Sequence, residues 1–196
     1  MSAHATGLET GVFPSKRENV MPNAQLGMLI FVTTEIMFFI ALISSYMVIK
    51  SRTGNWVPPG NLTLPVEATA FNSVILLLSG VFCFVANRKL GSGDVNWRRW
   101  FLRSIILGAF FVTFQGVEWV KLVSYGMTMT SSVFGACFFL LIGSHGLHAL
   151  SAVLGMSYFY FKSRHTTLEK STMTAITIFW FFIVGVWPML YGLVYF

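Results

Sequence analysis

Charged residues are scarce in this chain of 196 residues, with only 13 basic and 7 acidic side chains. They make up 10% of the sequence, against roughly 25% in an average soluble domain. Hydrophobic residues instead account for 55% and aromatic residues for 16%. So few charges could hardly cover the surface that a soluble protein of this size exposes. The composition excludes a soluble enzyme, a disordered chain and a nucleic-acid-binding protein, and it indicates a polytopic membrane protein.

Cysteine is also scarce. Cys83 and Cys137 are the only two cysteines. Both lie inside apolar stretches, where a buried thiol behaves as a small apolar side chain. The sequence has no CxxC or other metal-ligand spacing, so we expect neither a disulfide nor a metal pair. The first 25 residues also lack the apolar core of a secretory signal peptide.

Five long apolar runs are present, and none alternates polar with apolar residues as a membrane β-strand would. Runs of this length predict membrane-spanning helices, because lipid offers the backbone no hydrogen-bond partner. The predicted spans are residues 26–49, 68–86, 101–120, 131–161 and 173–196. The sequence therefore predicts an all-α, five-helix membrane domain over residues 26–196, preceded by a polar N-terminal segment over residues 1–25.

The basic residues are distributed unequally between the two sides of these spans. The side that carries the N-terminus has ten of them: Lys16, Arg17, Arg88, Lys89, Arg98, Arg99, Arg103, Lys162, Arg164 and Lys170. The other side has Lys50, Arg52 and Lys121. Because basic loops stay in the cytoplasm, we expect a cytoplasmic N-terminus and an external C-terminus.

Glu35 lies nine residues into the first predicted span, about 14 Å from its cytoplasmic end. A charged side chain near the bilayer centre costs at least ~2.5 kcal/mol. The carboxyl should therefore face protein, water or a lipid headgroup, and it should be neutral if it is unpaired. Two interpretations remain open: a structural acid hydrogen-bonded to a neighbouring helix, or a role in lipid, proton or ion handling.

His145 and His148 form an HGLH motif in the fourth span, and their spacing places both rings on one helical face. His148 lies about 20 Å from the cytoplasmic end of its span, a depth similar to that of Glu35. We therefore predict a pair between Glu35 and His148. Two histidines and one glutamate could also bind a metal ion. However, histidines three apart on one helix cannot hold one haem from both faces, and the chain has only four histidines. No cofactor is expected in this chain.

Glu118 lies near the outer end of the third span, where a carboxylate is less costly than at the centre. A solvated or capping role is the simpler alternative to a functional one, and Gln115 shares its helical face. The sequence shows no phosphate-binding loop and no pairing of nucleophile with base. It also shows no repeated halves of the kind that transporters have.

Five motifs stand out along the chain: LGMLIFVTTEIMFFIALISSY (26–46), WVPPGN (56–61), AFNSVILLLSG (70–80), TFQGVEW (113–119) and FGACFFLLIGSHGLHALSAVLG (134–155). Together they resemble subunit III of the haem–copper terminal oxidases, in the short five-helix form found in bacteria. The resemblance runs from about residue 21 to residue 196.

The resemblance implies a multi-pass subunit of the bacterial inner membrane without redox centres of its own. In that family, subunit III packs against subunit I, which holds the haems and copper, and the complex with subunit II reduces O₂ to water and pumps protons. Subunit III binds structural phospholipids, supports proton uptake on the cytoplasmic side and protects subunit I from inactivation during turnover. Glu35 matches the family's carbodiimide-reactive acid, which lies near bound lipid, as does the histidine matched by His148. An extended subunit I sometimes supplies the two helices that the short form lacks.

The sequence departs from the family pattern in its last span. The family usually has W-H-F-V-D-V-V-W there, whereas residues 180–187 read WFFIVGVW. Phe181 and Val184 thus replace a histidine and an aspartate, and Gln25 replaces a basic residue that often precedes the first motif. Polar contacts of those groups are not carried over. Two alternatives remain open: the related accessory protein of a nitric oxide reductase, and a stand-alone transporter or channel.

Overall fold

The computed structural model describes residues 22–54, 56 and 66–195. Nearly all of the polar N-terminal segment, with Lys16 and Arg17, lies outside the described residues, as does WVPPGN apart from Trp56. The described part of the chain forms five helices, all long and apolar enough to cross a membrane. They are α1 (Asn23–Arg52), α2 (Val66–Gly91), α3 (Trp97–Ser124), α4 (Val133–Lys162) and α5 (Lys170–Tyr195). The predicted all-α, five-helix architecture is confirmed.

The helices and the predicted apolar spans differ mainly at their ends. The helices have 26 to 30 residues and are about 39 to 45 Å long, which exceeds the ~30 Å hydrocarbon core. Polar and basic residues continue α2 and α3 beyond the apolar runs, because a helix can extend into the interfacial region. By contrast, α4 begins two residues later than predicted. The Ser132 side chain accepts a hydrogen bond from the Gly135 N–H and thereby caps the N-terminus of α4.

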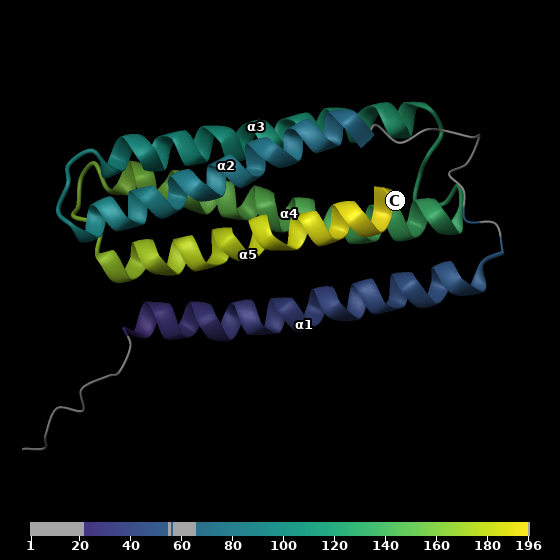
Figure 1. Ribbon diagram of the computed structural model, residues 1–196, viewed down its shortest axis with the longest axis horizontal. Coiled ribbons are helices and arrows are strands. Elements are labelled where there is room, and N and C mark those ends of the chain that lie inside the picture. The colour runs from purple at the N-terminus through teal and green to yellow at the C-terminus, as the bar shows by residue number, and fades with distance from the viewer. Residues whose placement is uncertain (1–21, 55, 57–65, 196) are drawn as a thin grey trace, which may run out of the picture.

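Four of the helices form a closed ring. In this ring α2 packs on α3, α3 on α4, α4 on α5, and α5 on α2. The first helix, α1, lies outside the ring against α4 and α5 (Figure 1). Over their most apolar 18 residues, 56% of α5 is buried but only 11% of α1. The ring is therefore the packed unit, and α1, outside it, is the least covered of the five described helices.

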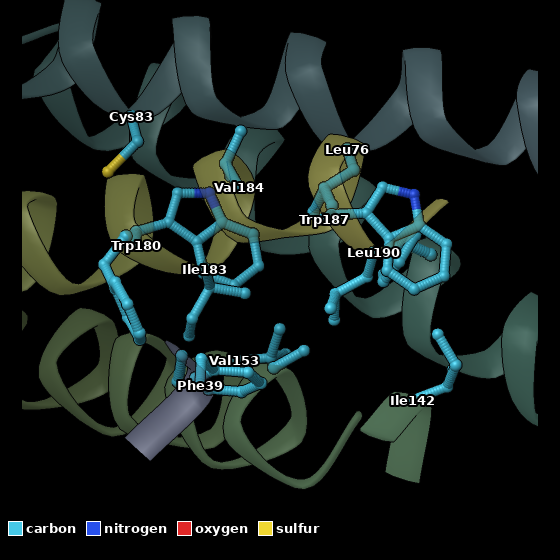
Figure 2. Close-up of a cluster of buried hydrophobic side chains, with 14 of the residues drawn as sticks. Phe39, Leu76, Cys83, Ile142, Val153, Trp180, Ile183, Val184, Trp187 and Leu190 are labelled. Atoms are coloured by element: carbon cyan, nitrogen blue, oxygen red, sulfur yellow. The ribbon is translucent and has the colours of Figure 1, made fainter. Parts of the chain in front are cut away.

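Two tryptophans of α5 fill the centre of the ring. Figure 2 shows Trp180 and Trp187 side by side along α5, with side chains of α2 on one side and of α4 on the other. Trp180 is fully buried and Trp187 is 1% exposed. Each indole also donates a hydrogen bond to α2, from Trp180 Nε1 to Ser79 Oγ at 3.1 Å and from Trp187 Nε1 to Ser73 Oγ at 2.7 Å. These bonds fix how far α5 is rotated relative to α2.

The small residues of α2 and α3 allow this close packing. Ser79 and Ser104 each donate a hydrogen bond to the other's carbonyl oxygen, both at 2.8 Å. Gly108 leaves the space that the Trp180 ring occupies, since a Cβ there would lie 2.9 Å from the ring. Small interfacial residues have this role in membrane proteins, where apolar lipid gives no hydrophobic drive for helix association.

The turn between α2 and α3 is held by Asp94. Gly93 has a positive φ of 75°, which reverses the chain. The Asp94 carboxylate then accepts hydrogen bonds from Lys89 Nζ at 2.6 Å and from the Asn96 backbone N–H at 2.9 Å. The bond from Lys89, followed by that from Asn96, holds the pKa of Asp94 below its ordinary value. The carboxylate thus stays charged and keeps the two helices side by side.

Replacing Gly108 with alanine should destabilise the ring by about 1–3 kcal/mol, because the new methyl group would overlap the Trp180 ring. Gly116→Ala on the same helix is the matched control, since its Cβ would meet no atom within 4 Å. Equilibrium unfolding in mixed detergent micelles measures both. Equal effects of the two substitutions would contradict the packing described here.

Candidate functional site

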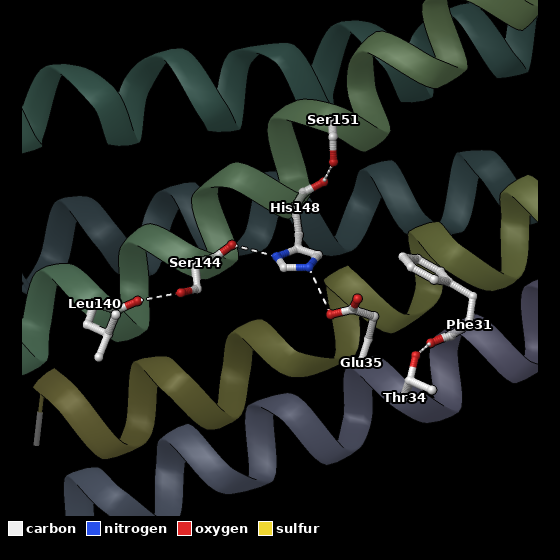
Figure 3. A network of polar contacts seen from close by, with 7 residues as sticks. All are labelled: Phe31, Thr34, Glu35, Leu140, Ser144, His148 and Ser151. Atoms are coloured by element: carbon white, nitrogen blue, oxygen red, sulfur yellow. Dashed lines mark hydrogen bonds and ion pairs between the residues drawn. The ribbon is translucent and has the colours of Figure 1, made fainter.

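The polar contact between α1 and α4 joins Glu35 to His148. Glu35 Oε2 lies 2.9 Å from His148 Nε2 (Figure 3). Glu35 is 12 residues from the start of α1 and His148 is 14 residues from the end of α4, so they lie about 18 Å and 21 Å from the same end of the bundle. The predicted contact between these two residues is confirmed.

The contact requires a proton between the two side chains. His148 Nδ1 is 2.7 Å from the Ser144 carbonyl oxygen, which can only accept, so Nδ1 carries a hydrogen. One further proton is then shared between Nε2 and Glu35 Oε2. Whether it lies on the carboxyl or on the ring, the pair as a whole is neutral. This neutrality allows an acid to lie deep in an apolar bundle without the full penalty of an isolated charge.

Aromatic rings enclose the pair on one side and leave it partly open on the other. Phe39 is buried and lies 5.4 Å from His148 between ring centroids, while the more exposed Phe38 lies at 6.1 Å. The Glu35 and His148 side chains remain 17% and 18% exposed. The five helices therefore do not enclose the pair completely.

His145 and His148 share the helical face that was predicted, but they have different partners. Both rings contact Phe39. His145 is 1% exposed, and its Nε2 donates to the Ile183 carbonyl oxygen of α5 at 3.1 Å. Its Nδ1 has no hydrogen-bond partner. The first histidine of HGLH thus joins α4 to α5, and the second joins α4 to α1.

Glu118 lies apart from this pair, near the other end of the bundle. Its Oε1 is 2.8 Å from Lys121 Nζ on the same helix, and the residue is 8% exposed. Gln115, one turn earlier, donates from Nε2 to the Tyr195 hydroxyl at 3.4 Å. The structure therefore brings Glu35 and His148 together, whereas it places His145 and Glu118 in separate environments.

Sequence reasoning missed Ser144. Its backbone carbonyl sets which nitrogen of His148 carries a hydrogen, and its hydroxyl bonds to the Leu140 carbonyl. The spacing of four residues from Ser144 to His148 was the available signal, because it places a carbonyl beside a ring one turn later. Backbone groups have no signature in a side-chain motif, so this contact was not expected.

The family's missing polar residues in the last span are replaced by an apolar contact. Val184 is 6% exposed, and its methyl carbon lies 3.3 Å from the position of a Cβ at Gly80. Phe181 packs against Phe84 with 6.2 Å between ring centroids. The α2–α5 contact at this level is therefore made by apolar side chains. Within residues 22–54, 56 and 66–195, no three His, Cys, Asp or Glu side chains are grouped as metal ligands.

Comparison with known proteins agrees with this architecture. The family model described as cytochrome c oxidase subunit III matches residues 7–196. A probable cytochrome c oxidase subunit 3 of Nocardia farcinica is 32% identical, with 89% of each chain covered. Cytochrome c oxidase subunit 3 of Corynebacterium diphtheriae is 33% identical over the same shares. Quinol oxidase subunit 3 of Bacillus subtilis is 29% identical, covering 87% of this chain and 85% of the relative.

A double-mutant cycle with Glu35→Ala and His148→Ala should give a coupling free energy of about 1 kcal/mol, since the two side chains bond across helices. Glu35→Gln should destabilise less than Glu35→Ala, because an amide can still bond to His148 Nε2. Unfolding in mixed micelles gives the values. Thr34→Val is the control, as its hydroxyl bonds only within α1 to the Phe31 carbonyl. Additive effects of the two alanine substitutions would contradict the pair.

Restoring the family's aspartate by Val184→Asp should destabilise the protein by about 2–3 kcal/mol, because the acid would be buried without a partner against Gly80. Val184→Thr has nearly the same shape and can bond to its own helix, so it should cost less. Thermal unfolding of the purified variants compares them. A stable Val184→Asp variant would show that α5 has a polar partner that the geometry does not reveal.

Proposed function

Because the chain belongs to the cytochrome c oxidase subunit III family, we propose that it is the non-catalytic subunit III of a proton-pumping haem–copper oxidase. Such a complex reduces O₂ to water with haems and copper held by its other subunits. In this proposal the chain packs on subunit I beside subunit II and stabilises subunit I. The paired, partly open Glu35 carboxyl is the observation that carries the proposal.

The Glu35–His148 pair is proposed to bind lipid and to support proton uptake. A hollow of about 170 Å³ lies beside it between α1, α4 and α5, lined by residues including Met28, Ser151, Gly155 and Phe179. Met28 precedes Glu35 by about two turns of α1, and Ser151 follows His148 by one turn of α4, so the hollow lies on the side of the pair nearer the N-terminal end of α1. An acyl chain fits such an apolar hollow, and its headgroup would lie at the basic end of the bundle.

We infer the orientation of the bundle from that basic end. Eight of the described basic residues lie where α1 starts, and three lie at the opposite end. We place the first end in the cytoplasm of a bacterial inner membrane, by the positive-inside rule. The pair then receives protons from the cytoplasmic side, as the proposed role requires.

The uncovered surface of α1 is proposed as a contact with the rest of the complex. Large apolar side chains such as Ile30, Met37 and Ile40 are more than half exposed on this helix. In the long form of the family, two further helices precede the first helix of this chain. Helices supplied by subunit I are the proposed partners for this face.

Purification of the tagged chain in a mild detergent should recover a haem-bearing subunit I and a subunit II. The haem spectrum and the masses of the partners check this result. A chain that purifies alone and without haem would contradict the proposal. A nitric oxide reductase partner would instead support the accessory role in that enzyme. The names of the relatives include both cytochrome c and quinol oxidases, and the partner masses also identify the electron donor.

Glu35→Ala should leave the haem spectrum of the complex unchanged but shorten its active lifetime during turnover several-fold. The reason is that a lost Glu35 removes a lipid and proton contact, not a redox group. Oxygen consumption followed to inactivation measures this effect, with Thr34→Val as the control on the same helix. Loss of haem from the Glu35→Ala complex would contradict the proposed role and indicate one in assembly.

A further inference from the structure

An exposed face of α3 carries two arginines at the basic end of the bundle. Arg99 and Arg103 are one helical turn apart, and both side chains are exposed. Their spacing places them on the same face as Ile106 and Phe110, which are 56% and 44% exposed. This face is remote from α1 and the hollow beside it, because α1 and α3 lie on opposite sides of the bundle (Figure 1).

These two arginines are not neutralised by the protein, unlike the basic residues next to them. Lys89 is held in the ion pair of the α2–α3 turn, and the Arg98 guanidinium donates a hydrogen bond to the Ser163 carbonyl oxygen at the end of α4. Within residues 22–54, 56 and 66–195, neither Arg99 nor Arg103 has a carboxylate partner. Both charges are therefore available to an anion.

The two charges lie at the edge of the hydrocarbon layer. Arg103 is between seven and eight residues from the middle of α3, about 11 Å along the helix. With α3 centred in the bilayer, its backbone lies inside the ~15 Å half-thickness of the hydrocarbon core, whereas Arg99, at about 17 Å, lies just outside. A charge at this depth is costly unless it reaches the headgroup layer or is paired.

The Arg103 guanidinium is held in place by aromatic rings. It lies over the Trp100 ring, at 4.8 Å from the ring centroid. Trp100 in turn packs edge-on against Phe82 of α2, with 5.4 Å between centroids. The cation is therefore fixed to the α2–α3 interface, at the level where lipid headgroups meet their acyl chains.

An anionic phospholipid matches both parts of this face. Its phosphate pairs with guanidinium groups through charge-assisted hydrogen bonds, and its acyl chains cover Ile106 and Phe110. A zwitterionic lipid would add a positive charge beside the two arginines. An acidic segment of a partner protein, or a free phosphate, would neutralise the arginines but leave the apolar side chains below them uncovered.

We propose that this face of α3 binds an anionic phospholipid, whose headgroup is held by Arg99 and Arg103 and whose acyl chains lie along Ile106 and Phe110. The site is separate from the hollow between α1, α4 and α5. It does not depend on the proposed role in an oxidase, because it needs only the bilayer and the residues of α2 and α3.

Photo-crosslinking in membranes that contain the full chain tests this proposal. The probes are a phosphatidylglycerol and a phosphatidylcholine with the same diazirine-bearing acyl chain, and mass spectrometry maps the labelled residues. Saturable labelling around Ile106 and Phe110, at least about fivefold stronger with phosphatidylglycerol, is the expected result. Unlabelled phosphatidylglycerol should compete. Soluble glycerol phosphate should not compete, and this comparison distinguishes a lipid headgroup from a free phosphate.

Charge variants test the two arginines. Arg99→Gln and Arg103→Gln should each lower the apparent affinity for phosphatidylglycerol about fivefold, because one basic residue near an anionic lipid surface contributes roughly this factor. Arg103→Lys keeps the charge and should retain most of the labelling. Arg88→Gln is the matched control. It removes a charge from the same end of the bundle, but its guanidinium lies over the Phe84 ring, 5.8 Å from the centroid.

Three results would each overturn the proposal. The first is equal labelling by the two lipids, which would indicate general contact with the bilayer. The second is phosphatidylglycerol labelling that Arg99→Gln and Arg103→Gln reduce no more than Arg88→Gln does. The third is no labelling of this face by either lipid, which would show that a partner protein covers it.

Discussion

The structure depends on the fit of the α5 tryptophans into the ring of helices. Lipid is as apolar as the side chains that it would replace, so burial alone does not hold helices together in a membrane. Trp180 instead gains dispersion contacts by filling the space left at Gly108, and its indole N–H is satisfied by Ser79. Trp187 repeats this arrangement two turns later with Ser73. Shape and hydrogen bonding thus select one rotation and one depth for α5, and α4 packs between α3 and α5.

The arrangement of the helices decides which buried polar groups find a hydrogen-bond partner. Some bond to a neighbouring helix: Ser79 bonds to Ser104, and Asn72 donates from Nδ2 to the Phe111 carbonyl. The Glu35–His148 pair extends the same principle to ionisable groups, because one shared proton leaves it neutral. Other buried polar atoms, among them Asn72 Oδ1, Thr69 Oγ1 and His145 Nδ1, have no hydrogen-bond partner within the described residues.

Much of this fold was predictable from the sequence because it depends on length and composition. Five apolar runs gave the five helices, and residue counts along two of them gave Glu35 and His148 the same depth. The packing was not predictable in this way. Gly108 and Gly116 lie two turns apart on α3, yet Trp180 fills the space at the first and nothing fills the space at the second. No local pattern distinguishes them, because the difference lies on α5. For the same reason HGLH predicted one shared face but not that His145 would bond to Ile183.

The first helix is attached by different means from the others. The ring helices meet through small residues and buried indoles, whereas α1 meets α4 and α5 largely through aromatic contacts such as Phe39 with Phe182 and Phe31 with Phe179. Within residues 22–54, 56 and 66–195, the Glu35–His148 pair is also the only ion pair between two helices. Because the ring packs without α1, a change in this pair acts on the seam and leaves the ring intact.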